Sequence, residues 1–368
     1  MAGFPFMKQA EAFRSSLPFI LLLAVFILPC PMSAAAKPRP AIAFVHLLLP
    51  PGGEPHASPA GWIGSLDRAR DTLESLRIPT IVSSASPRNA EDLNELSEMD
   101  PEVLITTSPL LYAAACDVAK RSPNTVFFAC TDETVHDNMS GFQARTYEAH
   151  YLAGLIAGAL SEDGVIGYLA NDPYQSKASR LRNANAFTLG AQKSKAAIRV
   201  LYAPGNDPDE ELKTLIAAGA DIVDLERALP SLVERLREHS VRYVGTAGRT
   251  VDPLCLAAPE WECSNVFGDL LTQVRFGIWR PRNVSYGIKE GVVGLSPFGP
   301  AVPEPVRVRV REATEAIRNG ASPFEGPVRD VSGSLRIAEG SVPDDATLRG
   351  MDWRVQGLEP LPLTPDGL

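Results

Sequence analysis

The residues that could do chemistry form no catalytic pattern in this sequence. Five histidines are present, at positions 46, 56, 136, 150 and 239, and none lies at a telling interval from an acid or a thiol. The nearest approach to a nucleophile elbow, Gly61 to Ser65, has the wrong spacing for G-x-S-x-G. No Cys-x-x-Cys pair and no cysteine–histidine pairing at zinc spacing occurs. The sequence therefore predicts a protein that is not an enzyme and that has no metal site.

Phosphate-binding loops are also missing. A dinucleotide fingerprint needs G-x-G-x-x-G directly after the first strand, but residues 50–55 read PPGGEP. Three prolines there prevent the tight turn into a helix N-terminus that holds a pyrophosphate. No Walker loop occurs elsewhere in the chain. A Rossmann oxidoreductase is therefore disfavoured, and no cofactor is expected.

Short apolar runs alternate with helical patterns along most of the chain, which is typical of parallel sheets with both faces covered. The expected strands are 42–49, 80–84, 103–107, 126–130, 165–170, 199–203, 222–225 and 242–245. The expected helices are 61–76, 90–99, 110–121, 177–193, 209–218 and 232–239, with one more that contains His150 and has its apolar face at 152–160. After about residue 250 the order changes, with a helix at 266–277, strands at 284–288 and 292–295, and a helix at 305–319. With 368 residues, the pattern predicts an α/β fold of two lobes.

Polar residues end many of the expected strands. Because ligands of open parallel sheets bind at the carboxyl ends of the strands, these positions predict a ligand pocket. They are His46, Thr107, Ser108, Thr131, Asp132, Asn171, Asp172, Glu226 and Thr246. Trp62 begins the first expected helix, where it either stacks on a flat ligand or packs between lobes. His150 lies inside a helix and is expected to be a partly exposed helix residue.

The N-terminus has the pattern of an export signal. Lys8 and Arg14 precede an apolar run, 17–28, whose length suits a signal-peptide core better than a membrane-spanning helix. The alanines at 34–36 offer a cleavage site, so residues 1–36 are expected to be a removed signal peptide. The formal net charge of −9 disfavours nucleic acid and anionic membrane surfaces as partners.

The cysteines leave two questions open. Lipid attachment at Cys30 is the alternative to cleavage, although a proline stands before it where lipoprotein signals prefer a small residue. Export permits disulfides, and a loop-closing bridge between Cys255 and Cys263 is one expectation. Cys116 and Cys130 fit buried thiols as well as a disulfide bond.

Residues 142–154, FQARTYEAHYLAG, resemble a segment of the basic membrane protein family, the PnrA-like substrate-binding proteins of ABC importers. Further runs resemble the same family, at 166–170, 184–191, 219–222, 287–291, 295–303, 323–327 and 350–353. The resemblance extends from about residue 40 to residue 357. It implies a type I periplasmic-binding fold, in which two doubly wound parallel-sheet lobes are joined by three hinge crossovers and the ligand binds in the cleft. Members of the family usually capture purine nucleosides or related bases.

The resemblance also implies a division of the chain, with crossovers near residues 143, 247 and 286. The expected parts are a signal peptide (1–36), a first lobe (38–142 plus 248–285), a second lobe (143–247 plus 286–330) and a C-terminal wrapping tail (331–368).

The pocket positions depart from the family pattern, whereas the scaffold positions keep it. Gly64 and Leu66 stand where the family has tyrosine and histidine. Residues 106–110 lack the family's aromatic residue, and 226–230 lack its polar cluster. Residues 245–249 lack its ribose-binding carboxylate. These changes keep open a ligand other than a purine.

We therefore predict a monomeric periplasmic binding protein that delivers a small molecule, a purine base or nucleoside, to an ABC permease in the inner membrane. The alternatives are an exported sensor that signals to a membrane partner and a pocket that has diverged to a non-purine ligand. The predicted ligand-binding residues are Trp62, His46, Asp67, Thr107, Ser108, Thr131, Asp132, Tyr174, Glu226 and Thr246. Among them, Trp62 is expected to stack on a planar ring, and the hydroxyls and carboxylates to bind its polar edges.

Overall fold

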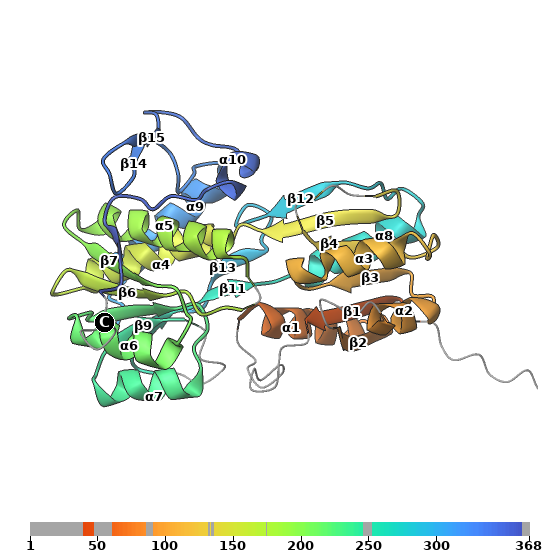
Figure 1. Ribbon diagram of the computed structural model, residues 1–368, viewed down its shortest axis with the longest axis horizontal. Coiled ribbons are helices and arrows are strands. Elements are labelled where there is room, and N and C mark those ends of the chain that lie inside the picture. Colours follow the sequence, from red (N-terminus) through yellow and green to blue (C-terminus); the bar gives the residue numbers. More distant parts are fainter. Residues whose placement is uncertain are drawn as a thin grey trace, which may run out of the picture. The chain divides into compact units, whose positions relative to one another are not determined.

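The computed structural model describes residues 40–47, 61–85, 91–131, 133, 136–173, 175–245 and 252–362, and only the backbone of 61–63. These residues belong to one compact unit, 39–368. Within it, two parallel sheets form two α/β lobes (Figure 1). None of the described helices has the length and apolar character that crossing a membrane requires.

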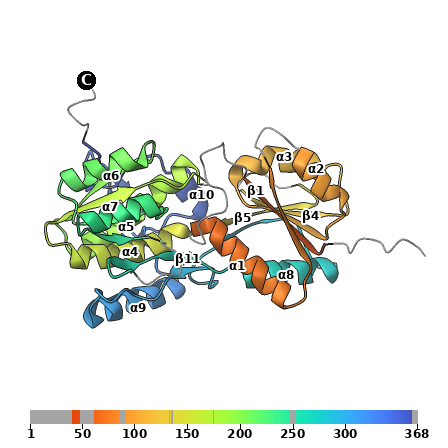
Figure 2. The same cartoon turned by 90° about the horizontal axis from the view of Figure 1, so that it is seen from below.

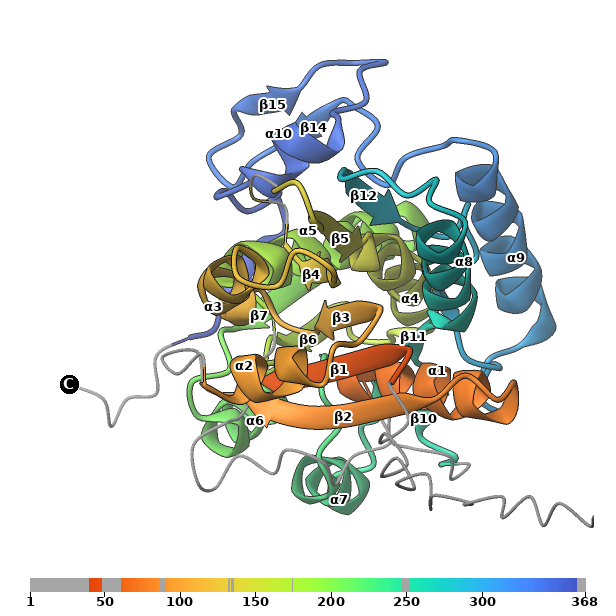
Figure 3. The ribbon, with the colours of Figure 1, turned by 90° about the vertical axis from the view of Figure 1, so that its right-hand side faces the viewer.

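The first lobe is built on a six-stranded sheet of order β12-β5-β4-β3-β1-β2. Its strands are β1 (Ile42–Leu47), β2 (Thr80–Ala85), β3 (Val103–Thr106), β4 (Val126–Cys130), β5 (Met139–Ala144) and β12 (Asn283–Tyr286). All neighbouring strands run parallel, and β12 lies beside β5 (Figure 3). The residues of β1 and β3 are all buried, as expected for central strands of a covered parallel sheet.

Helices cover both faces of the first sheet (Figure 2). On one face lie α1 (Gly61–Ser75) and α8 (Ser264–Arg275), and on the other α2 (Glu91–Glu98) and α3 (Tyr112–Ala119). Phe267 of α8 meets the sheet edge-on, with its ring centroid 5.4 Å from that of Phe44 and 6.2 Å from that of Phe142. Such edge-to-face contacts fix α8 to the first lobe, although α8 comes late in the sequence.

The second lobe is built on a six-stranded sheet of order β10-β9-β8-β6-β7-β16, again parallel throughout. Its strands are β6 (Val165–Leu169), β7 (Arg199–Ala203), β8 (Ile222–Leu225), β9 (Arg242–Val244), β10 (Cys255–Ala257) and β16 (Leu358–Pro360). One face carries α4 (Thr146–Leu160) and α5 (Lys177–Ser194), and the other α6 (Pro208–Ala217) and α7 (Pro230–Glu238) (Figure 1).

Glycines allow α4 and α5 to pack backbone against backbone. A Cβ atom added at Gly154 would lie 2.0 Å from the carbonyl oxygen of Phe187, and one at Gly158 would lie 2.2 Å from that of Ala191. No side chain fits there without moving the helices apart. This close approach accounts for the two glycines spaced four residues apart on α4.

The chain passes between the lobes at three places. The first passage joins β5 to α4, and the third joins β12 to β13 (Val293–Leu295). The second follows β10, which pairs with β9, so the chain returns to the first lobe after Ala257 and not near residue 247. Residues 255–257 thus extend the second sheet, although the predicted first lobe includes them. Beside this passage, β11 (Pro259–Trp261) pairs antiparallel with β13.

The C-terminal part packs on the second lobe. Helix α9 (Glu304–Arg318) lies against α4. The hairpin of β14 (Val328–Arg329) and β15 (Leu335–Ile337) precedes a short helix, α10 (Asp345–Arg349). The chain then enters the second sheet as β16, beside β7.

Candidate ligand-binding cavity

A cavity of about 340 Å³ lies at the carboxyl ends of β4 and β5 and at the amino ends of α4 and α5. Its walls are formed by Pro109, Tyr112, Cys130, Thr131, Glu133, Gln143, Ala144, Thr146, Gln175, Ser176, Ala178, Ser179, Arg182, Trp261 and Arg349. Because these residues come from both lobes, a molecule bound here would contact both. The volume is within the range of roughly 300–1,000 Å³ that is usual for small-molecule pockets.

Two aromatic rings give the cavity an apolar side. Tyr112 begins α3 and is half-buried, while Trp261 of β11 is buried. Burial, together with a hydrogen bond to Cys116, raises the pKa of Tyr112 to about 12, so its phenol is neutral at physiological pH. Neutral rings of this kind bind flat apolar or heteroaromatic groups.

A hydrogen-bonded set of side chains forms the polar side of the cavity. Gln175 Nε2 donates to Asp172 Oδ2 at 3.1 Å, and Gln175 Oε1 accepts from Asn183 Nδ2 at 3.0 Å. Thr146 Oγ1 donates to Asn183 Oδ1 at 2.7 Å. Ser176 caps α5 by accepting from Ser179 N at 3.1 Å. The amino ends of α4 and α5 are thereby tied together, which holds the polar groups in fixed orientations.

Arg182 and Arg349 add positive charge to the wall. Arg182 is only 6% exposed, and its Nη1 donates to Leu348 O at 3.3 Å. Arg349 ends α10, whose first residue, Asp345, accepts hydrogen bonds of 3.1 Å from Arg145 Nε and 2.9 Å from Nη2. The Arg145 fork, located where β5 passes into α4, therefore fixes the helix that carries Arg349.

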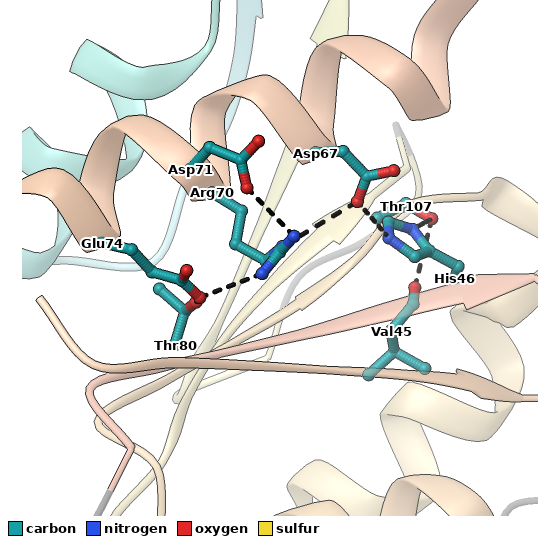
Figure 4. Close-up of polar contacts among 8 residues, drawn as sticks. All are labelled: Val45, His46, Asp67, Arg70, Asp71, Glu74, Thr80 and Thr107. Atoms are coloured by element: carbon teal, nitrogen blue, oxygen red, sulfur yellow. Dashed lines mark hydrogen bonds and ion pairs between the residues drawn. The ribbon is translucent and has the colours of Figure 1, made fainter. Parts of the chain in front are cut away.

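Of the predicted ligand-binding residues, Thr131 lines the cavity. His46, Asp67 and Thr107 meet elsewhere, at the end of β1 (Figure 4). His46 Nδ1 lies 3.1 Å from Thr107 Oγ1, and Nε2 lies 3.6 Å from Asp67 Oδ1. Thr107 Oγ1 also donates to Val45 O at 3.1 Å. None of the three lines the cavity. Their contacts tie β1, α1 and the residue after β3 to one another.

Two further predicted residues have structural contacts. Ser108 is buried, and its hydroxyl accepts from Leu110 N at 3.3 Å, capping the 3-10 turn η1 (Pro109–Leu111). Glu226 is buried in the second lobe, where its Oε1 accepts from the hydroxyl of Tyr168 at 2.9 Å. Polar residues at strand ends therefore serve capping and packing here as well as pocket walls.

The prediction that His150 is partly exposed is wrong, because only 2% of its surface is accessible. Helix α4 turns this residue toward β8, where His150 Nδ1 lies 3.4 Å from Asp224 Oδ2. The apolar face of α4 shows that the helix is buried, but it does not show that the carboxylate of Asp224 faces His150.

The expected bridge between Cys255 and Cys263 is also wrong, since no disulfide joins the described cysteines. Cys255 belongs to β10 of the second lobe, with its sulfur 3.5 Å from Gly245 O. Cys263 precedes α8 of the first lobe and is buried, which raises the pKa of its thiol to about 12. The pair spans the second passage between lobes instead of closing a loop.

Several predictions fall on parts of the chain outside the described residues. They are the side chain of Trp62, residues Asp132, Tyr174 and Thr246, and the export segment 1–36 with Cys30.

The sequence reasoning missed most of the cavity wall. Gln175 and Arg182 come after β6, the first strand of the second lobe. The strand-end rule, that ligands bind at the carboxyl ends of parallel strands, predicted residues near these two but not the two themselves. Arg349 comes from the tail, whose return to the cavity has no local sequence signal.

Two parallel α/β lobes joined by three passages, with a cavity between them, define the type I fold of periplasmic solute-binding proteins. A solved structure of an ABC transporter solute-binding protein from Conexibacter woesei DSM 14684 has this fold, with a TM-score of 0.60 and 17% sequence identity. The match covers 76% of this chain and 97% of that one. At this identity the likeness concerns the fold alone.

The sequence comparisons agree with the resemblance. Residues 65–217 match the family of PnrA-like ABC transporter substrate-binding proteins. A purine-binding protein of Brucella abortus (strain 2308) is 27% identical over 348 residues, which is 89% of this chain and 95% of that protein. A putative ABC transporter glucose-binding protein of Haloferax volcanii is 28% identical over 310 residues, 77% of this chain and 78% of that protein. The family that matches is thus the one that the resemblance predicts, and the match covers residues 65–217 of this chain.

Proposed function

We propose that this protein is exported and delivers a purine base or nucleoside to an ABC permease in the inner membrane. The observation that carries the proposal is the cavity, because residues of both lobes line it and combine aromatic rings with fixed polar groups. The similarity to a purine-binding protein over most of both chains supports the choice of ligand.

The cavity suits a planar heterocycle in two ways. Tyr112 and Trp261 provide ring faces, and ring stacking adds about 0.5–1.5 kcal/mol beyond the buried area. Gln143 and Gln175 carry amides, which can both donate to and accept from the edge of a base. Trp62 stays a predicted stacking residue, and Asp132 a predicted polar contact.

The proposed transport mechanism follows from the fact that both lobes contribute residues to the cavity wall. A ligand can contact the ends of β4 and β5 in the first lobe and the ends of α4 and α5 in the second lobe. Such a ligand favours the closed arrangement of the lobes, in which it contacts both at once. The three passages between the lobes are the proposed hinges. A permease would then distinguish loaded from empty protein by its closure, with the protein acting as a monomer.

A thermal-shift screen of the protein purified without residues 1–36 tests this function. Purine bases, nucleosides and simple sugars are compared at equal concentration. At 100 times its dissociation constant, a ligand adds about 2.7 kcal/mol to the free energy of unfolding. The expected result is a raised melting temperature with at least one purine. A shift with a sugar and none with any purine would refute the proposed ligand and leave the proposed role in transport intact.

A further inference from the structure

We propose that a groove between α5 and the C-terminal segment, the C-terminal groove, binds a small anion with two or more negative charges. The groove has a volume of about 630 Å³ and lies apart from the cavity of the proposed function. The inference goes beyond that function, because it assigns a second ligand and a second site.

Helix α5 separates the groove from the cavity. Lys177, Arg180 and Leu181 line the groove at positions i, i+3 and i+4, so they share one face of the helix. The cavity is lined by other residues of α5, among them Ser179 and Arg182. No described residue belongs to both walls. A molecule in the groove therefore does not occupy the purine site.

The C-terminal segment is held over α5 by hydrogen bonds that Asn185 makes to its backbone. Asn185 Nδ2 donates to Trp353 O at 2.8 Å, and Asn185 Oδ1 accepts from Val355 N at 2.9 Å. Val331 N donates to Arg354 O at 3.1 Å, which joins the segment to the β14–β15 hairpin. The outer wall of the groove is thus fixed, although it comes from stretches of the chain far from α5 in the sequence.

Cations outnumber carboxylates on the wall of the groove. Arg336 and Asp330 form a pair, with 2.6 Å between Arg336 Nε and Asp330 Oδ2. Asp352 is the other carboxylate among the described residues of the wall, and it is exposed. The remaining cations of the wall are Lys177, Arg180 and Arg354.

The charges of these three cations are not used within the described part of the chain. Arg180 Nη1 donates to Ala170 O at 2.6 Å and to Pro204 O at 3.1 Å, two neutral carbonyls that follow β6 and β7. No carboxylate of the described residues forms an ion pair with Arg180, Lys177 or Arg354. The two carbonyls orient Arg180 without cancelling its charge, so a bound anion would supply the opposite charge.

Tyr202 adds a neutral polar group to the wall. Burial raises its pKa to about 12, and the charge of Glu226 adds to the rise, so the hydroxyl keeps its proton and can donate to an anion. The charge of Glu211 also acts on this ring. Its oxygens, however, accept from Gly205 N at 2.6 Å and from Asn206 N at 3.1 Å. The loop after β7 thus engages that carboxylate.

The chemistry of the wall indicates an anion with several charges. A guanidinium offers a planar fork of N–H donors to phosphate or carboxylate oxygens, and a lysine ammonium offers a compact charge. Three such groups around one groove exceed what a single negative charge neutralises, and the volume of the groove admits more than one anionic group. Oligophosphates and polycarboxylates share this chemistry, and pyrophosphate and citrate represent the two sources.

Isothermal calorimetry on the purified protein, at constant ionic strength, tests the site. Pyrophosphate, citrate and acetate are titrated separately. We expect pyrophosphate, citrate or both to bind with one-to-one stoichiometry, and acetate to bind roughly 10- to 100-fold more weakly, because it forms fewer hydrogen bonds to charged groups. The tighter of the two multiply charged probes tells whether the ligand carries phosphate or carboxylate groups.

Three variants locate the binding. Arg354→Gln and Lys177→Gln should each weaken it about tenfold, since each removes one charged partner. Arg311→Gln removes an exposed arginine of α9 that pairs with Glu304, and it should leave the affinity unchanged. Purine binding should be the same in all three, because none of these residues lines the cavity. Melting temperatures check that the fold is intact.

The outcomes separate this proposal from the proposed function. The groove proposal is overturned if neither pyrophosphate nor citrate binds more tightly than acetate, or if Arg354→Gln and Lys177→Gln bind them as tightly as the unchanged protein. Purine binding is untouched by either result. Pyrophosphate binding that depends on Arg354, in a protein that binds no purine, would support the groove and refute the proposed ligand of the cavity.

Discussion

Among the described residues, each lobe buries one histidine at its parallel sheet, and the surroundings of the two histidines differ. In the first lobe, His46 contacts the Thr107 hydroxyl and the side chain of Asp67, which is 38% exposed. In the second lobe, His150 faces Asp224, whose side chain is fully buried, and Tyr168. The first cluster keeps contact with solvent through Asp67, whereas the second is closed. The same residue type is therefore buried beside a partly exposed carboxylate in one lobe and beside a fully buried one in the other.

The closed cluster holds several ionisable groups in one dry volume. Burial lowers the pKa of His150, but the charge of Asp224 and the hydrogen bond to it outweigh this effect and raise the pKa overall. Burial raises the pKa of Glu226 to about 7, and the nearby charge of Asp172 adds to the rise. Protons are thus held more firmly in this cluster when the protein is folded.

The largest expected loss of stability comes from removing the buried carboxylate of the second cluster. Asp224→Leu leaves His150 without its carboxylate, and it should lower the free energy of unfolding by about 3–5 kcal/mol. Urea denaturation measures the loss. A loss below about 1 kcal/mol would mean that the second cluster contributes no more than an exposed pair.

The pH dependence of stability should show the next largest effect. A raised pKa in the folded state means that the folded protein binds the Glu226 proton more tightly, so stability is greatest below the ordinary pKa and falls as pH rises to about 7. His150 contributes with the same sign, because its pKa is also raised. We expect the Glu226 contribution to fall by about 2–3 kcal/mol over this window.

Glu148 is also buried and its pKa is also raised to about 7, so it titrates in the same pH window. Glu226→Gln separates the contribution of Glu226 from that of Glu148. Melting curves between pH 4.5 and pH 8 should be flatter for Glu226→Gln than for the unchanged protein. Parallel curves would show that the closed cluster holds no extra proton.

The smallest effect is expected in the first lobe. Asp67→Asn weakens a partly exposed pair with His46, and the stability should change by about 1 kcal/mol or less. The same urea titration used for Asp224→Leu gives the direct comparison. A loss as large as that of Asp224→Leu would show that the first cluster is equally essential to the fold.

Much of the fold could be predicted from the sequence, because buried strands leave a strong local pattern. Strands such as 126–130 and 199–203 occur where the β-branched and aromatic runs predict them. The short strands β10 and β16, of three residues each, were missed. Their pairing depends on the sheet edges that receive them, which no local pattern encodes.

The site was less predictable for a physical reason. The strand-end rule located His46 and Thr107 together, and the structure joins them. It gave only Thr131 among the described residues of the cavity wall, because Arg182 belongs to a helix and Arg349 to the tail. The closed cluster was hidden as well, since the helical pattern of α4 shows which face is buried but not what it meets.

The central claim is that the cavity binds a planar small molecule through groups from both lobes, and calorimetric titration of purines tests it most directly. We expect at least one purine to bind with one-to-one stoichiometry, and Tyr112→Ala to weaken that binding about tenfold, the loss of one stacked ring. A purine that binds Tyr112→Ala as tightly as the unchanged protein would show that its site lies outside this cavity.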